Sequence, residues 1–201
     1  MHHIGTGIST ISVLCAVWLG LLLAGASWTD ARSRRISNKL VLAGALTGLA
    51  LNTLLPVGDG LFSAAPGGLG FSGALGGGAV GLGLLLPFYL LRIMGAGDVK
   101  LMAMVGSFLG PASILGAVLM ALLAGGILAL AVAFWKGIVR STLANVRSML
   151  INTLLSALSG PAKPIERLPA APAATLPYAL AIAAGTVGQI LLARDGHALF
   201  L

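Results

Sequence analysis

The feature that most constrains the fold is a long apolar run near the start of the chain, because comparable runs recur to its end. Residues 8–28 carry no charged side chain. A helix that spans a bilayer needs about 20 apolar residues. Only 8% of the 201 residues are charged, far below the roughly 25% that is usual for soluble domains. The sequence therefore excludes an ordinary cytoplasmic domain, a disordered chain and a coiled coil, and predicts an all-α polytopic membrane protein.

Six apolar runs predict a six-transmembrane-helix bundle that forms a single membrane-embedded domain over residues 1–201. The expected spans cover residues 8–28, 40–57, 71–91, 98–109, 112–135 and 176–193. Gly110 and Pro111 separate the fourth span from the fifth, and the fourth is so short that we expect it to lie deep within the bundle. Glycines at four-residue spacing in the second and third spans are expected to let helix backbones pack closely.

A different pattern lies between the last two spans. In residues 137–158, apolar side chains recur at helical spacing, while Arg, Asn and Ser lie mostly off that stripe. This pattern predicts an additional cytoplasmic amphipathic helix on the membrane surface. A Pro-rich cytoplasmic linker is expected over residues 159–172.

The basic residues predict the orientation. Of the twelve Lys and Arg residues, all but Arg194 fall on one side of the predicted topology, after the first, third and fifth spans. Because Lys and Arg concentrate in cytoplasmic loops, this asymmetry predicts that both termini lie outside. The net charge of +7 is attributed to these loops beside the bilayer, so no nucleic-acid partner is expected.

Two of the five acidic residues stand out by their position. Asp30 directly follows the first expected span and Asp98 starts the fourth, so the predicted topology puts both at the cytoplasmic membrane boundary. Ionisable groups near membrane depth are costly and are therefore functional candidates. The other acids are expected to be solvated loop charges: Asp59, Glu166 and Asp195.

Each candidate also has a plain structural explanation. Asp30 could be an interfacial charge balanced by Arg32 or Arg34, and Asp98 could cap the start of its helix. Two neighbouring carboxylates, however, do not both ionise easily, so one keeps a proton. The ionised member can then activate water while the protonated member donates to the carbonyl oxygen under attack. Peptide hydrolysis without a covalent intermediate is the reaction that such a pair supports.

Other chemistries find little support. The single cysteine, Cys15, excludes a disulfide framework and a four-cysteine zinc site. His2, His3 and His197 lie at the termini, on the side opposite the two aspartates. We therefore expect no metal site.

The residues around both aspartates resemble a known family. GAGDVKL at 95–101 resembles the GxGD signature of the type IV prepilin peptidases, a family of intramembrane aspartic proteases. DARSRRISN at 30–38 resembles their other aspartate motif, and PYALAIAAG at 177–185 looks like their last helix. The family commonly has Pro where Ser37 stands here, a departure that loosens the turn but removes no proposed catalytic group.

The resemblance implies that Asp30 and Asp98 are the catalytic pair, with Gly95, Gly97 and Lys100 as supporting residues of the second motif. Without Cβ atoms, the two glycines are expected to let a substrate backbone approach and to permit positive φ. The implied partners are a prepilin, which has a basic leader and a hydrophobic helix, and membrane lipid. The implied location is the cytoplasmic face of the bacterial inner membrane, and no cofactor is implied.

We expect the chain to lack the cysteine-bearing N-terminal region of the long family members, and it looks like the short, peptidase-only form that serves tight-adherence (Flp-type) pili. Three alternatives stay open: another GxGD protease such as a preflagellin-type peptidase, a proton-coupled transporter that uses the same acids, and a non-enzymatic assembly factor with a protease fold.

The helix dipoles predict different roles for the two acids. Because Asp98 begins a helix and Asp30 ends one, we expect Asp98 as the ionised base and Asp30 as the protonated acid.

Overall fold

The chain divides into two compact units in a computed structural model that describes residues 3–63, 65–91, 93–137, 144, 147–148, 151 and 178–194. The first unit joins Met1–Gly125 to Pro177–Leu201, and the second is Gly126–Leu176. The secondary structure of the described residues is helical apart from an isolated bridge between Val57 and Gly68. The all-α class is therefore confirmed for this part of the chain.

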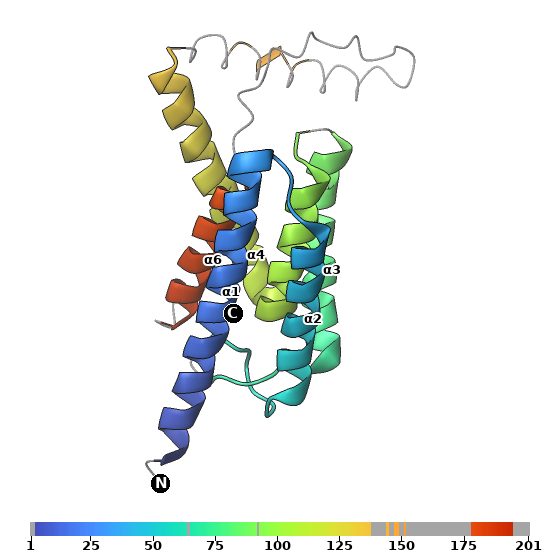
Figure 1. Cartoon of the computed structure of the whole chain (residues 1–201), viewed down its shortest axis with the longest axis vertical. Helices are drawn as coiled ribbons and strands as arrows, with labels where there is room; N and C mark the ends of the chain where they lie inside the picture. Colours follow the sequence, from blue (N-terminus) through green and yellow to red (C-terminus); the bar gives the residue numbers. More distant parts are fainter. Residues whose placement is uncertain are drawn as a thin grey trace. The chain divides into compact units, whose positions relative to one another are not determined.

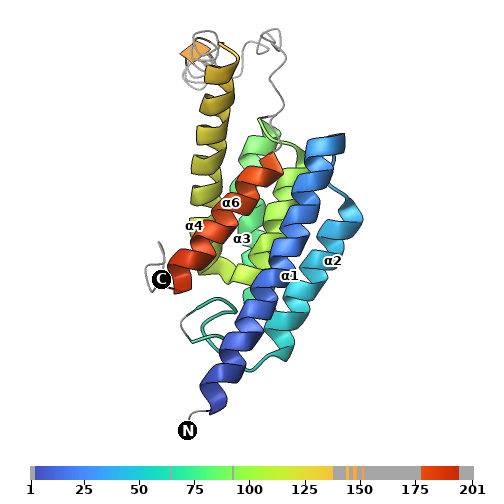
Figure 2. The ribbon, with the colours of Figure 1, turned by 60° about the vertical axis from the view of Figure 1, so that its left-hand side comes forward.

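The first unit is a bundle of helices that run up and down (Figure 1 and Figure 2). Its members are α1 (His3–Ser33), α2 (Asn38–Leu54), α3 (Gly70–Leu90), the first 30 residues of α4 (Ala96–Trp135) and α6 (Tyr178–Arg194). Both views place the end of α1 and the starts of α2, α4 and α6 at the same end of the bundle. The two segments that hold the aspartate motifs are therefore neighbours at this end.

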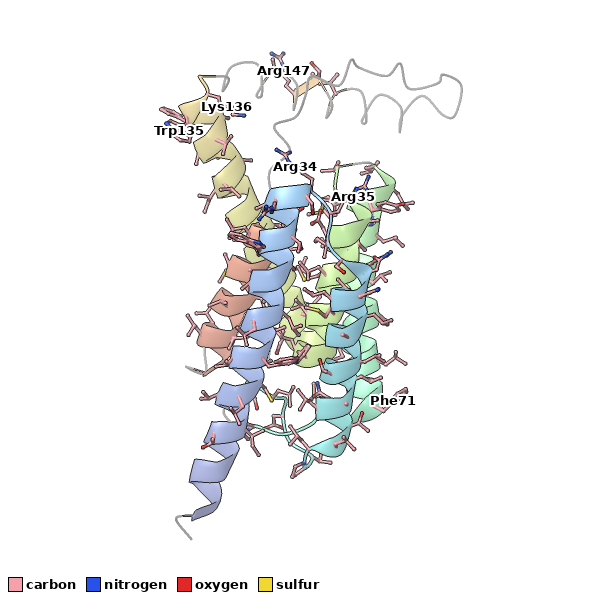
Figure 3. All side chains as sticks on the ribbon, viewed as in Figure 1. Arg34, Arg35, Phe71, Trp135, Lys136 and Arg147 are labelled. Atoms are coloured by element: carbon pink, nitrogen blue, oxygen red, sulfur yellow. The ribbon has the colours of Figure 1, made fainter. Side chains whose placement is uncertain are left out.

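The second unit contains the C-terminal part of α4. Its side chains Trp135, Lys136 and Arg147 are exposed (Figure 3). Of the expected amphipathic helix, residues 144, 147, 148 and 151 are described and are helical. The rest of residues 138–158 and the expected linker at 159–172 lie outside the described residues, so the amphipathic helix stays a prediction.

Three helices are long and apolar enough to cross a membrane: Thr10–Ser33, Gly70–Leu90 and Ala96–Trp135. The helices α2 and α6 have 17 residues each and are shorter than the usual span. Large apolar side chains also cover the outside of the bundle, and Leu14 and Leu21 are 63% and 61% exposed. Such an exterior suits hydrocarbon better than water. The chain is thus a membrane protein, while the count of six spans stays a prediction.

The helix α4 breaks at Gly110, where the backbone takes φ 80° and ψ 175°. This conformation is open to glycine and strained for other residues, and Pro111 follows as a natural start for the next helical segment. The chain reverses direction there (Figure 2), as the Gly-Pro pair predicted. We call residues 96–109 the first arm of α4 and residues 111–135 its second arm.

The first arm of α4 forms the centre of the bundle, which confirms the prediction for the short fourth span. Its side chains Leu101, Met102, Met104, Val105 and Phe108 have no exposed surface. An arm of this length is only about 20 Å long, too short to cross the hydrocarbon core. The first arm does not need to span the membrane by itself, because the neighbouring helices of the bundle surround it.

The expected close packing of glycines is confirmed on both sides of this arm. A side chain at Gly44 would collide with Met104, and one at Gly48 with Ser107 and Phe108. Gly77 faces the backbone of Gly106 so closely that neither position has room for a Cβ atom. These glycines bring α2 and α3 against α4 and serve packing.

A buried asparagine holds the end of the bundle where α4 reverses. Asn52 is 1% exposed, and its Nδ2 donates to the carbonyls of Ser107 at 2.8 Å and Phe108 at 3.2 Å. In a continuous helix the Ser107 carbonyl would accept the N–H of Pro111, which proline lacks. The Oδ1 atom of Asn52 accepts the N–H of Leu69 at 3.0 Å. One side chain thus joins α2, the break in α4 and the loop before α3.

Candidate active site

Asp30 lies on the last turn of α1, inside the helix. The sequence put the end of this helix at Trp28, but α1 continues to Ser33. The hydroxyl of Thr29 donates to the carbonyls of Gly25 and Ala26 at 3.0 Å each. The hydroxyl of Ser33 donates to the carbonyl of Thr29 at 2.7 Å. These local bonds satisfy the polar side chains that ended the apolar run, so the helix carries Asp30 on a rigid backbone.

The helix α1 ends where Arg34 takes a left-handed conformation, with φ 55°. The Arg34 N–H still donates to the carbonyl of Asp30, at 2.8 Å. A left-handed residue just past the last turn is a common helix stop, usually provided by glycine. Figure 3 shows Arg34 and Arg35 at this end of α1, where the chain turns into α2. The stop therefore fixes Asp30 one turn from the end of its helix.

The carboxylate of Asp30 contacts the start of α6. Its Oδ2 accepts the backbone N–H of Ala179 at 3.2 Å, across 149 positions of sequence. Ala179 lies in the first turn of α6, whose N–H groups have no partner within the helix. Asp30 therefore occupies the N-terminal end of α6, although it belongs to the C-terminal end of α1.

Asp98 lies in the first turn of α4, three residues after Gly95. Its Oδ2 accepts the N–H of Gly95 at 3.2 Å, and its own N–H donates to the carbonyl of Gly95 at 3.1 Å. A carboxylate that reaches back to the residue before the helix is one half of a capping box. The structural explanation offered for Asp98 is thus confirmed. The cap uses the Oδ2 atom of Asp98, and the Oδ1 atom takes no part in this hydrogen bond.

The bundle brings Asp30, Asp98 and Tyr178 together. Asp98 interacts electrostatically with Asp30, and Tyr178 interacts electrostatically with Asp98. All three side chains are half-buried. The three residues come from α1, α4 and α6, so the fold makes one cluster from distant parts of the sequence.

The two aspartate motifs also contact each other directly. A Cβ atom at Gly97 would lie 3.3 Å from the Cβ atom of Ile36, so Ile36 packs on the bare backbone before Asp98. Two residues after Asp98, the Nζ atom of Lys100 donates to Oδ1 of Asn38 at 3.3 Å. Gly97 and Lys100 thus hold the second motif against the segment that follows Asp30.

The two motif glycines do not use positive φ. Left-handed glycines among the described residues are Gly60, Gly70, Gly110 and Gly137, so the freedom that Gly95 and Gly97 have to adopt positive φ is not used. The need for glycine at 97 comes instead from the close approach of Ile36. At Gly95, an added Cβ atom would lie 3.4 Å from Oδ2 of Asp98, which is ordinary contact.

The helix-dipole argument for separate roles does not hold. It treated Asp30 as a group at a helix C-terminus, but the Asp30 carboxylate also accepts an N–H at the start of α6. Asp98 accepts an N–H at the start of α4. Since both acids lie at the positive end of a helix dipole, this argument no longer distinguishes the base from the acid.

Sequence reasoning missed the part that α6 plays in the site. Tyr178 opens this helix, its hydroxyl donates to the carbonyl of Ala121 at 3.4 Å, and its ring lies against Gly125. Residues 177–185 resemble the last helix of the family, yet this resemblance assigns neither Tyr178 nor the N–H of Ala179 to the site. A backbone N–H leaves no mark in the sequence, so only the fold reveals it.

Asp59 is exposed in the loop between α2 and α3, as expected, whereas Glu166 and Asp195 lie outside the described residues. In the part of the chain that the structure describes, no three His, Cys, Asp or Glu side chains form a group able to hold a metal ion. The absence of a cofactor stays a prediction.

Comparison with known proteins adds a family assignment. The model of the type IV leader peptidase family matches residues 14–130, more than half of the 201 residues. The matched region includes Asp30 and Asp98. No curated protein matches the chain, and no solved structure does. By its sequence, then, the chain belongs to the type IV leader peptidase family.

Proposed function

We propose that this peptidase is a membrane aspartic endopeptidase that removes the basic leader from a type IV (Flp-like) prepilin. The observation that carries the proposal is the convergence of Asp30 and Asp98. Each comes from its own sequence motif, and the contact of Ile36 with Gly97 and the hydrogen bond from Lys100 to Asn38 hold the two motifs together. The family assignment supports leader cleavage in general, and the two motifs support the aspartic mechanism.

The proposed reaction needs one ionised and one protonated carboxyl. The ionised carboxylate takes a proton from water while the water oxygen forms a bond to the scissile carbonyl carbon. The protonated carboxyl gives its proton to the carbonyl oxygen, which yields a neutral gem-diol. Collapse of the gem-diol breaks the C–N bond. The carboxyl that took the water proton gives it to the leaving nitrogen, and the other carboxylate takes a proton from a gem-diol hydroxyl, which becomes the carbonyl of the new carboxylic acid. Both carboxyls are then back in their starting forms.

The charge pattern supports the proposed orientation. Arg32, Arg34 and Arg35 lie within the first motif and Lys39 follows it. Positive residues favour the cytoplasmic side of a membrane. With Asp30 and Asp98 at that end, cleavage takes place at the cytoplasmic face of the bacterial inner membrane and both termini lie outside. A basic leader finds anionic lipid headgroups at the same surface.

The proposal is tested by cleavage in membranes. A prepilin precursor is co-expressed with the wild-type protein, with Asp30→Asn and with Asp98→Asn, and its mass is measured. Loss of a general acid or base costs roughly 10²- to 10⁴-fold in rate, so each variant should leave the precursor uncut. Asp59→Asn is the matched control, because Asp59 is an exposed loop acid. Cleavage by both single variants would refute the two-aspartate mechanism.

A further inference from the structure

An apolar groove opens on the first unit between α2 and α3. Its volume is about 610 Å³, within the range of roughly 300–1,000 Å³ that is usual for binding sites. The walls include Leu42 and Leu46 of α2 and Leu75 of α3, and the floor includes Ala103 and Ser107 of α4. The three leucines are more than half exposed, so the groove is open along its side.

The groove begins at the end of the bundle where the candidate active site lies. At one end it is lined by Asn38 and Lys100, which hydrogen-bond to each other. Lys100 follows Asp98 by two residues on α4, and Asn38 ends the first aspartate motif. The groove then follows α2 as far as Leu49, a distance of about 16 Å along the helix. The groove and the two aspartates therefore share one end of the bundle, where Asn38 and Lys100 each belong to one of the two aspartate motifs.

The groove walls favour a helix as the occupant. A peptide inside hydrocarbon must satisfy its own backbone hydrogen bonds, so a segment that continues from the scissile bond into the membrane must be helical. Small residues let a helix backbone approach closely, and the groove is lined by Ala45, Ala74, Gly78 and Ala103. About three helical turns match the 16 Å length.

We infer that this groove docks the apolar helix of the substrate, with the residues directly after the scissile bond beside Lys100. This inference rests on the proposed leader peptidase function. The leader stays at the cytoplasmic surface, the scissile bond lies at Asp30 and Asp98, and the first three turns of the substrate helix lie between α2 and α3. The groove thus selects substrates whose cleavage site is followed at once by an apolar helix.

A pair of matched substitutions tests the inference. Ala79→Trp adds a bulky side chain on α3 at the groove, whereas Ala43→Trp adds the same side chain at an exposed position of α2 outside the groove lining. Each variant is assayed with two substrates: a membrane-anchored prepilin, and a soluble peptide that holds the leader and scissile bond but lacks the apolar helix. Overpacking by Ala79→Trp should lower kcat/KM for the anchored substrate roughly ten- to a hundredfold, and should leave the soluble peptide unaffected.

Each outcome has a defined meaning. Equal loss on both substrates, or no loss relative to Ala43→Trp, overturns the groove inference while the wild-type cleavage upholds the proposed function. Cleavage of neither substrate by the wild type overturns the proposed function and the inference with it.

Disulfide trapping gives a readout that does not depend on turnover. Ala79→Cys is placed in a Cys15→Ser, Asp98→Asn background, and single cysteines are moved along the substrate helix. Cross-links that recur every three to four residues support a docked helix. Cross-links no stronger than those of Ala43→Cys in the same background overturn it and leave the groove to lipid acyl chains.

Discussion

Replacing Asn52 by leucine removes the side chain that joins α2, the break in α4 and the loop before α3. Leucine has a similar volume, so the change deletes hydrogen bonds without opening a large cavity. The Nδ2 atom of Asn52 donates to Ser107 and Phe108, and its Oδ1 atom accepts the N–H of Leu69. The Ser107 carbonyl has no helical replacement, because Pro111 carries no N–H.

The expected cost follows from the groups left unpaired. Each buried polar group without a partner costs about 1–3 kcal/mol, and the Ser107 carbonyl and the Leu69 N–H are two such groups. Hydrogen bonds inside membrane bundles average about 0.6 kcal/mol in double-mutant cycles, which moves the expectation toward the lower half of the range. We therefore expect Asn52→Leu to reduce the free energy of unfolding by about 3 kcal/mol.

The assay is unfolding in detergent micelles, followed by tryptophan fluorescence against a denaturing detergent. Thr53→Val is the matched control, because its exposed hydroxyl bonds only to Leu49 of the same helix among the contacts the structure describes, at 2.6 Å. We expect the control to cost less than about 1 kcal/mol. If Asn52→Leu is no more destabilising than Thr53→Val, the assignment of Asn52 as the joint of this end of the bundle is wrong.

Three further changes test the site and its supports. Gly97→Leu should lower cleavage roughly tenfold, because Ile36 must move and displace the second motif, and adding Ile36→Ala should restore part of the loss in a cleavage assay. Tyr178→Phe deletes a long hydrogen bond and should change the unfolding free energy by less than about 1 kcal/mol with cleavage retained; a large loss of cleavage with normal unfolding would place its hydroxyl in the chemistry. Gly185→Ala should destabilise the protein by at least about 2 kcal/mol, since its Cβ atom meets the backbone of α4. Gly188→Ala is the control in the same helix, because its Cβ atom meets nothing within 4 Å, and equal unfolding midpoints for the two would contradict the packing argument.

The apolar runs and the glycine and proline residues that separate them predicted much of the fold. The Gly-Pro pair at 110–111 correctly marked the break in α4, because glycine permits the left-handed backbone and proline starts a helix. Helix ends were less accurate: local hydroxyl bonds by Thr29 and Ser33 extend α1 past the end of its apolar run. Such bonds depend on side-chain conformation, which hydropathy does not report.

For the site, the sequence identified the two aspartates as a pair and predicted the helix cap at Asp98, but missed how Asp30 is held. The partner of Asp98 is Gly95, three residues earlier, so its cap was predictable. The partner of Asp30 is a backbone N–H of α6, 149 residues away. Every residue except proline carries that group, so no residue type could signal it. The electrostatic environment expected for Asp30 therefore left out the positive end of the α6 dipole.

The hydrogen bond between Asp30 and Ala179 joins parts of the site that are far apart in sequence. Fragments of the chain can therefore lose part of the site. The family match ends at residue 130, whereas α6 begins at Tyr178. A fragment that stops at residue 130 would keep both aspartates and both motifs, and would still lose the N–H that holds one carboxylate and the tyrosine beside the other. Intact motifs are therefore an insufficient criterion for an active enzyme in truncated or split versions of this chain. A separately supplied α6 is the piece that such a fragment would need to complete its site.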